Sequence, residues 1–142
     1  MAAAEKYLEQ LRRVPLFHGI PDADLGAIAR QLSERSYEPG AVIVKQGEAG
    51  IGFYLIDEGK VEVEQNGRVL ATLGRGDFFG ELALMEDVPR TASVIARTPT
   101  RCLQLVRWHF RSILKENPDI AIRVLETAVR RIRRHEGDQA TS

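Results

Sequence analysis

Glu81 and Arg90 lie nine residues apart in a segment whose composition could bind a small anion. The segment, residues 77–93, reads Asp-Phe-Phe-Gly-Glu-Leu-Ala-Leu-Met-Glu-Asp-Val-Pro-Arg-Thr-Ala-Ser, and about one helical turn fits between its glycine and its proline. A helical turn that begins at a glycine presents backbone N–H groups that attract an anion. A guanidinium can hold a phosphate through two charge-assisted hydrogen bonds, and a carboxylate accepts hydrogen bonds from hydroxyl groups. The pattern therefore predicts a sugar phosphate as ligand.

Other kinds of chemistry find little support in the sequence. The three histidines, His18, His109 and His135, lie outside the strand-like region, and no loop carries the alternating acidic residues of a calcium site. Cys102 lies in a strand-like run, and no Gly-x-Ser-x-Gly sequence is present. We therefore expect no metal site, no catalytic residue and no enzymatic activity.

The sequence divides into three zones, which together must position residues 77–93. Residues 1–36 are expected to form two short helices, the first over Ala2–Arg13 and the second with Asp22 as its N-cap. Residues 37–106 change to a two-residue alternation of apolar and polar side chains, which is typical of β-strands. Residues 107–137 return to a helical pattern.

The strand-like zone has the features of an antiparallel roll. Nine of the twelve glycines lie between residues 37 and 100, and we expect them at turns that need a positive φ. Asn66-Gly67, between two alternating runs, predicts a hairpin. Many short strands separated by turns indicate a barrel or sandwich. The predicted fold class is α+β: an antiparallel β-roll, similar to a jelly-roll barrel, flanked by N-terminal helices, a hinge helix and a long C-terminal helix.

The last zone predicts two helices. Trp108–Glu116 can form two turns, and Pro118 suits a helix start because its φ is fixed and it lacks an N–H. In residues 119–135 apolar side chains recur every three or four positions, and Gly137 is expected to end that helix, with a frayed tail behind it. The helix has an apolar stripe, which either packs on the roll of its own chain or forms the a/d face of a helix pair. The stripe consists of Ile122, Leu125, Val129 and Ile132.

Composition and charge indicate how many domains the chain forms, in which compartment it lies and which partners it should not attract. A chain of 142 residues with 44% hydrophobic and 28% charged residues is expected to fold as one globular domain. The short apolar runs predict no membrane segment, and the N-terminus predicts no secretory signal. A single cysteine favours the reducing cytoplasm. Residues 37–100 carry a net charge of −4 and residues 101–142 one of +4, so the central zone should not attract nucleic acid.

In its motifs the chain resembles the cyclic-nucleotide-binding domain family. A short spacer separates two runs that look like the family's phosphate-binding cassette, which we place at residues 78–93: Phe79-Gly80-Glu81-Leu82-Ala83-Leu84 and Pro89-Arg90-Thr91-Ala92-Ser93-Val94. Further matches are Lys45-Gln46-Gly47-Glu48, Phe53-Tyr54-Leu55-Ile56 with Gly59, and Gly76-Asp77-Phe78. The order of helices, roll and helices also agrees from Pro15 to Arg134, which is most of the chain.

The resemblance implies a role for each matching residue. Glu81 would accept a hydrogen bond from the ribose 2′-hydroxyl, and Arg90 would neutralise the cyclic phosphate. The remaining donors would come from the backbone of Gly80, Leu82, Ala83, Thr91 and Ala92. Apolar contacts to the purine would come from Val63, Leu70, Leu73 and Leu82. The ligand would be cAMP rather than cGMP, but a hydroxyl at the position of Thr91 can contact guanine in this family, which leaves cGMP open.

The residues expected to cover the purine differ from those of the catabolite-activator-type members of the family. The base-contacting Thr-Ser pair of those proteins falls here at His135 and Glu136, near the expected end of the helix. Arg130 and Arg134 are the alternative candidates for a lid that stacks on the base. Only five residues follow Gly137, which leaves no room for a DNA-reading module, so we expect no DNA binding by this chain.

The sequence thus favours a cyclic-nucleotide sensor in which binding moves the C-terminal helix. Two alternatives stay open: a structural or interaction domain that keeps the roll without responding to nucleotide, and the ligand-sensing part of a transcription regulator whose DNA-binding module is absent. The expected partners are a second copy of the chain, bound through the C-terminal helix, or an effector domain or protein. An acidic effector could meet the arginines at positions 130, 131, 133 and 134.

Overall fold

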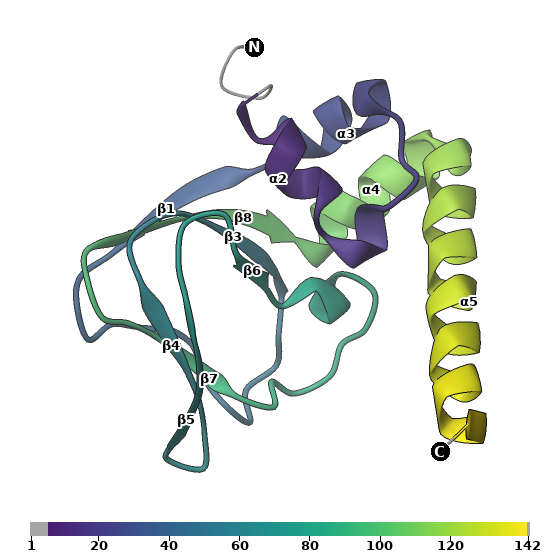
Figure 1. Cartoon of the computed structure of the whole chain (residues 1–142). Helices are drawn as coiled ribbons and strands as arrows, with labels where there is room; N and C mark the ends of the chain where they lie inside the picture. Colours follow the sequence, from purple (N-terminus) through teal and green to yellow (C-terminus); the bar gives the residue numbers. More distant parts are fainter. Residues whose placement is uncertain (1–5, 142) are drawn as a thin grey trace. The chain divides into compact units, whose positions relative to one another are not determined.

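The structure, a computed structural model, describes residues 6–141, apart from the side chains of Arg131 and of residues 134–141. The chain forms two compact units (Figure 1). Residues 31–110 form the first, here called the β unit, and the segments before and after them form the second, here called the helical unit. Helix α4 (Arg107–Glu116) begins in the β unit and ends in the helical unit.

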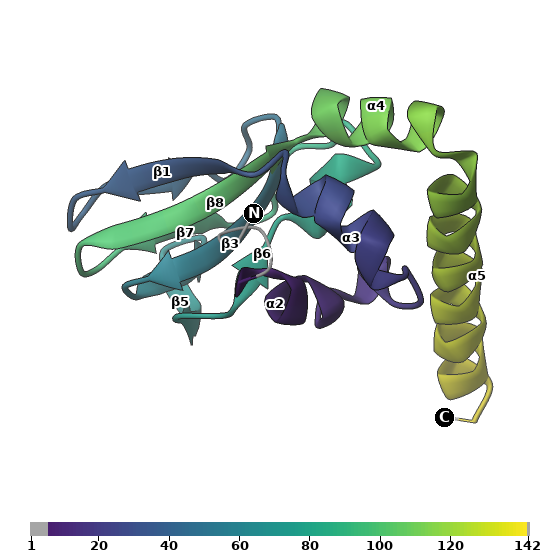
Figure 2. The ribbon, with the colours of Figure 1, turned by 90° about the horizontal axis from the view of Figure 1, so that it is seen from above.

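The β unit consists of two antiparallel sheets of four strands each, in the orders β1-β8-β3-β6 and β2-β7-β4-β5. Figure 2 shows β1, β8 and β3 side by side in the first sheet. The predicted antiparallel roll and the α+β class are therefore confirmed, but the strands do not close into a barrel. The strands are β1 (Ser33–Tyr37), β2 (Val42–Val44), β3 (Gly52–Glu58), β4 (Val61–Gln65), β5 (Arg68–Leu73), β6 (Phe78–Phe79), β7 (Ser93–Ala96) and β8 (Thr100–Val106).

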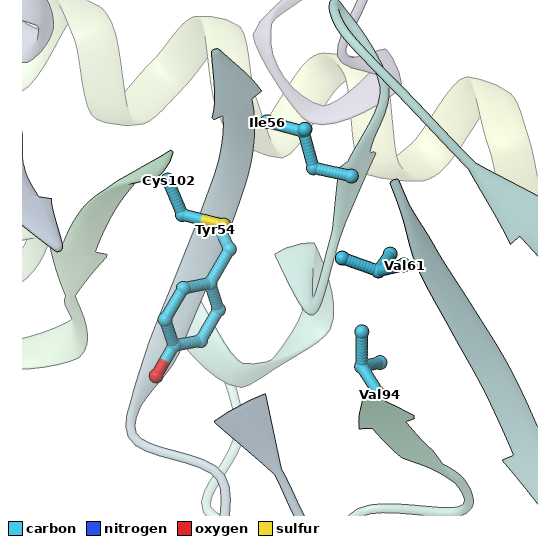
Figure 3. Packing of buried hydrophobic residues seen from close by; sticks show 5 residues of the cluster. All are labelled: Tyr54, Ile56, Val61, Val94 and Cys102. Carbon is cyan, nitrogen blue, oxygen red and sulfur yellow. The ribbon is translucent and has the colours of Figure 1, made fainter. Parts of the chain in front are cut away.

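The core of the β unit lies between the two sheets. Tyr54, Ile56 and Cys102 extend from β3 and β8 toward Val61 and Val94, which come from β4 and β7 (Figure 3). Every one of these side chains is at least 96% buried, which removes apolar surface from water on both sheets. Burial also raises the pKa of the Cys102 thiol to about 12, so this cysteine is protonated at neutral pH and serves as a packing residue.

The hairpin predicted at Asn66-Gly67 joins β4 to β5. Both residues have a positive φ, 53° and 80°, as a two-residue hairpin turn requires. Most of the glycines predicted at positive φ adopt it, namely Gly40, Gly47, Gly59, Gly67, Gly76 and Gly80.

Gly50, Gly52 and Gly74 do not have a positive φ, so the prediction for these three was wrong. Gly52 lies inside β3, where a Cβ atom would overlap the carbonyl oxygen of Leu105 on β8. The close approach of two backbones, rather than a turn, explains this glycine.

The helical unit contains α2 (Leu8–Arg12), the 3₁₀ helix η1 (Pro15–Phe17), α3 (Asp22–Ala29), the end of α4, and α5 (Pro118–Thr141). Its buried apolar residues come from all of these segments, and the largest fully buried ones include Leu11, Phe17, Leu25, Ile28 and Ile120. The helical start at Pro118 and the second N-terminal helix are confirmed. The first N-terminal helix, predicted over Ala2–Arg13, extends over Leu8–Arg12, and residues 2–5 of that prediction lie outside the described residues. None of the helices that the structure describes is long and apolar enough to cross a membrane.

Three predicted boundaries were wrong. Residues 33–36 belong to β1 rather than to the helical zone, because they pair with β8. Pro21 is the N-cap of α3, and Asp22 instead binds Arg12 through an ion pair of 2.8 Å. Helix α5 continues through Gly137 to Thr141, since one glycine costs a helix only about 1 kcal/mol and does not by itself end it.

Helix α5 has two apolar faces. Ile120, Val124 and Thr127 are buried, and the Thr127 hydroxyl donates a hydrogen bond of 2.8 Å to the carbonyl of His18, just after η1. The predicted stripe lies on the opposite side and its four residues are 45–64% exposed. The stripe is therefore not buried within the helical unit, and its packing on the β-roll stays a prediction.

The close backbone approach at Gly52 predicts a loss of stability in Gly52→Ala. The added methyl group would meet a backbone atom that cannot move aside, and such overpacking costs about 1–3 kcal/mol. We expect thermal denaturation several degrees below that of the unmodified protein. Gly74→Ala is the matched control, because a Cβ there would meet its nearest atom at 3.8 Å. Equal melting temperatures for the two variants would contradict this account of Gly52.

Candidate functional site

The β unit contains a cavity of about 380 Å³ that is lined largely by the predicted cassette. The lining combines apolar side chains of four strands with one carboxylate and one guanidinium, a composition suited to a small ligand with polar and apolar parts. The lining residues are Val44, Val63, Phe78, Phe79, Gly80, Glu81, Leu82, Ala83, Val88, Pro89, Arg90, Thr91, Ala92 and Val94.

One wall of the cavity is the 3₁₀ helix η2 (Glu81–Leu84), which begins after Gly80. Gly80 has left-handed backbone angles, φ 81° and ψ 17°, that favour glycine. The first hydrogen bond of this turn runs from the N–H of Ala83 to the carbonyl of Gly80. The N–H groups of Glu81 and Leu82 precede that bond, at the end of the turn that favours negative charge.

The backbone of Arg90 is held from both sides by the loop before β3. Its N–H donates to the carbonyl of Glu48, and its carbonyl accepts from the N–H of Gly47, both at 2.8 Å. Pro89 forms a bridge with Ala49 next to these bonds. This backbone pairing therefore fixes the point from which the Arg90 side chain extends.

The Arg90 guanidinium is half-buried, and no carboxylate that the structure describes forms an ion pair with it. One terminal nitrogen donates to the carbonyl of Gly52 at 2.5 Å, whereas Nε is buried without a hydrogen-bond partner among the described residues. Burial lowers the pKa of Arg90 and is the largest effect on it, whereas Tyr54 raises this pKa and the positive charge of Arg107 lowers it. A buried cation without a counter-ion is costly, so this site favours an anion.

Two glycines make room for this guanidinium. A Cβ on Gly50 would lie 2.7 Å from Nε, and a Cβ on Gly80 would overlap another nitrogen of the same group. Sequence reasoning placed Gly50 at a turn and missed its contact with Arg90. The spacing of Gly47, Gly50 and Gly52 was the only signal, and glycine spacing alone does not reveal which distant side chain fills the space.

The structure brings most of the predicted binding residues to the cavity. Glu81, Leu82, Ala83, Thr91 and Ala92 line it together with Gly80, Arg90 and Val63. Two predicted purine contacts are not among the lining residues, since Leu70 on β5 is 56% exposed and Leu73 packs against the core cluster. Six further lining residues were not predicted as ligand contacts, although four of them belong to the cassette: Val44, Phe78, Phe79, Val88, Pro89 and Val94.

The aromatic wall of the cavity continues into the core. The ring of Phe79 stacks on that of Tyr54, with centroids 4.9 Å apart and planes inclined by 11°. The Tyr54 hydroxyl accepts a hydrogen bond from Gln104, while burial raises its pKa. Stacked rings with a bonded hydroxyl are held rigidly, so this side of the cavity is preformed.

The predicted lid residues belong to the helical unit. Arg130 donates a hydrogen bond of 3.2 Å to the Thr127 hydroxyl on the same helix. The side chain of Arg134 lies outside the described residues.

Comparison with known proteins agrees with this geometry. A family model described as "Cyclic nucleotide-binding domain" matches residues 34–117, and the chain belongs to this family. Among curated proteins, a cAMP-dependent protein kinase regulatory subunit from Yarrowia lipolytica is 38% identical over 106 residues, which is 73% of this chain and 28% of that protein. The corresponding subunit from Schizosaccharomyces pombe is 35% identical over 115 residues, or 80% of this chain and 28% of that protein. The chain therefore spans about a quarter of the length of these relatives.

Two solved structures share the fold. The N-terminal domain of a transcriptional regulator from Streptomyces coelicolor superimposes with a TM-score of 0.81 and 31% identity, covering 89% of this chain and 94% of that one. The catabolite activator protein of Thermus thermophilus superimposes with a TM-score of 0.68 and 31% identity, covering 89% of this chain and 62% of that one. The relatives thus include regulatory subunits and transcription regulators, and the chain is a cyclic-nucleotide-binding regulatory domain.

The packing of Gly50 against Arg90 predicts a local effect of Gly50→Ala. A methyl group there would push against a flexible side chain, so the guanidinium should move while the fold is kept. We expect the ¹H–¹⁵N signal of Arg90 Nε to shift in NMR spectra, with the backbone signals of the sheets unchanged. Gly74→Ala, which has no contact with Arg90, should leave the Nε signal in place. An unshifted signal in Gly50→Ala would show that Gly50 does not position Arg90.

Proposed function

We propose that the chain senses a cyclic nucleotide, with cAMP preferred over cGMP, and passes the signal on through its C-terminal helix. The observation that carries the proposal is the half-buried guanidinium of Arg90, which has no carboxylate partner among the described residues and borders a cavity that also holds Glu81. The names of the curated relatives, which are regulatory subunits of a cAMP-dependent kinase, favour cAMP.

In this proposal Arg90 binds the cyclic phosphate and Glu81 accepts a hydrogen bond from the ribose 2′-hydroxyl. The backbone of the cassette supplies the remaining donors, from Gly80, Leu82, Ala83, Thr91 and Ala92. Val63 and Leu82 contact the purine from the cavity wall. For Leu70 and Leu73 to contribute as well, the purine would have to extend beyond the cavity toward β5.

The domain holds its ligand without converting it, so we assign it no enzymatic activity and no cofactor. Ligand binding changes the position of α5. Arg130 and Arg134 on this helix are the candidates for a lid over the purine. The relatives suggest two settings for that output, a kinase regulatory subunit and the ligand-sensing part of a transcription regulator. The lone cysteine of the sequence favours a cytoplasmic location.

Arg90→Ala should weaken cAMP binding at least about tenfold to a hundredfold, because a charged hydrogen bond contributes about 1.5–3 kcal/mol and a buried phosphate would lose its counter-ion. Arg90→Lys should also weaken it, since an ammonium cannot form the bidentate contact. Titration calorimetry measures both. Arg97→Ala is the matched control, because Arg97 belongs to the same unit, forms its ion pairs with Glu62 and Glu64 on β4 and does not line the cavity.

The same titrations test the role of Glu81. Glu81→Gln should keep phosphate recognition but reduce the preference for cAMP over its 2′-deoxy analogue. Wild-type affinity in Arg90→Ala would contradict the site. If no cyclic nucleotide produced heat or raised the melting temperature, the alternative of a structural or interaction domain would hold, because a ligand at 100 times its dissociation constant should stabilise by about 2.7 kcal/mol.

The exposed stripe on α5 favours a second copy of the chain as a partner. Its residues follow the three-four-three spacing of a helix pair, and they are exposed although the opposite face of the helix is buried. Two such stripes would cover each other in a symmetric dimer. An effector protein that meets the arginines of α5 is the other partner considered, and DNA binding by this chain is not part of the proposal.

Leu125→Glu should turn the dimer into a monomer, because it places two charges at the centre of the paired stripes. Sedimentation velocity at micromolar concentration measures the change. Val69→Glu is the matched control, since Val69 is similarly exposed, 53% against 64%, but lies on β5. A monomeric unmodified protein, or a dimer that survives Leu125→Glu, would contradict the proposed pairing.

A further inference from the structure

Two consecutive carbonyl groups of the cassette are held from outside the cavity. The carbonyl of Arg90 accepts a hydrogen bond of 2.8 Å from the N–H of Gly47, in the loop after β2. The carbonyl of Thr91 accepts one of 3.1 Å from the side-chain amide of Gln65, the last residue of β4. The end of the cassette is thus bonded both to the loop after β2 and to the β4–β5 hairpin.

The loop after β2 and the hairpin are also bonded to each other. The side-chain amide of Gln46 donates to Oδ1 of Asn66 and accepts from the backbone N–H of Asn66, both at 2.9 Å. The backbone N–H of Gln46 donates to the hydroxyl of Ser93, the last residue of the cassette, at 2.9 Å. Each of three segments is therefore bonded to the other two. The residues of this arrangement, here called the three-segment ring, are Gln46, Gly47, Gln65, Asn66, Arg90 and Thr91.

The ring fixes the direction of two backbone N–H groups. In a trans peptide the C=O and the N–H point in opposite directions, so a bond that holds the carbonyl also orients the N–H of the next residue. Gly47, which holds the carbonyl of Arg90, thereby orients the N–H of Thr91. Gln65, which holds the carbonyl of Thr91, orients the N–H of Ala92. Thr91 and Ala92 both line the cavity, and neither N–H donates to a residue that the structure describes.

The side-chain bonds of the ring lie near the surface. Asn66 is exposed, and Gln46 and Gln65 are half-buried. Strand β4 also pairs with β7 from Val61 to Glu64, and the two strands lie side by side in Figure 1. Opening the ring should therefore leave the sheet intact and loosen only the hairpin end and the peptide groups that it holds.

We propose that Gln46 and Gln65 are positioning residues that aim the N–H groups of Thr91 and Ala92 at a bound phosphate. The inference rests on the proposed function, because it requires that a cyclic phosphate binds beside Arg90. Neither glutamine lines the cavity, so both act through the backbone of the cassette. Preorganised donors of this kind bind an anion without first having to be ordered.

Gln65→Leu tests the proposal in the full chain, with cAMP as the probe. It removes the donor to Thr91 and keeps a side chain of similar size, so we expect cAMP to bind about two- to tenfold more weakly. The decisive readout is the amide proton shift in NMR spectra at saturating cAMP. In the unmodified protein the Ala92 amide should move downfield as it binds the phosphate. In Gln65→Leu this shift should shrink, whereas that of Leu82, whose N–H belongs to η2, should be kept.

Gln31→Leu is the matched control. It makes the same chemical change at an exposed glutamine of the β unit that does not line the cavity. Its cAMP affinity and its Ala92 shift should equal those of the unmodified protein.

A pair of carboxylate substitutions opens the ring without changing Gln65. In Gln46→Glu the new carboxylate still accepts from the N–H of Asn66 and from its side-chain amide once that amide has rotated. In Asn66→Asp the carboxylate accepts from Gln46, and aspartate tolerates the positive φ of this turn. Each single variant therefore keeps the ring. The double variant places two carboxylates against each other, so its loss of cAMP affinity should exceed the product of the two single effects.

The outcomes separate the two proposals. If the unmodified protein binds no cyclic nucleotide, the proposed function fails, and the role of the ring fails with it. If it binds cAMP but Gln65→Leu keeps its affinity and its Ala92 shift, only the role of the ring is overturned. Weaker binding with an unchanged Ala92 shift would overturn it as well, because the glutamine would then act through stability alone. If Gln65→Leu does not fold, the double variant decides: effects that simply multiply would contradict the ring.

Discussion

The site is organised around one guanidinium that is half-buried without a carboxylate partner among the described residues. A buried charge of this kind is costly unless acceptors surround it; the carbonyl of Gly52 is one, whereas Nε has no acceptor among the described residues. Because this guanidinium has no carboxylate partner among the described residues, the cavity suits an anion.

Three glycines, which lack a side chain, are as important for this arrangement as the side chains themselves. At Gly50 and Gly80 a Cβ would collide with Arg90, and at Gly52 it would collide with the backbone of β8. The first two glycines therefore serve the ligand site, whereas the third serves the sheet that carries it. Arg107 then connects the two segments that approach Arg90 through backbone carbonyls, which no substitution on those segments can remove.

Helix α5 shows how one element can serve two surfaces. Its buried face, with Ile120 and Val124, belongs to the core of the helical unit, and Thr127 is tied to the carbonyl of His18. The other face carries four large apolar side chains that are not buried within the helical unit. The same helix thus contributes one face to the core of its unit and keeps a second apolar face outside that core.

The sequence by itself determined the features whose interactions are local. The cassette, the Asn66-Gly67 hairpin and the helix that begins at Pro118 each depend on residues close together in the chain, so residue type and spacing predict them. Only the tertiary structure decided that Gly50 makes room for Arg90, that Leu73 packs in the core, and which face of α5 is exposed. These features depend on contacts with residues far along the chain. A pattern in the sequence indicates that a side chain is buried or that a glycine is required, but it does not show which distant residue lies against it.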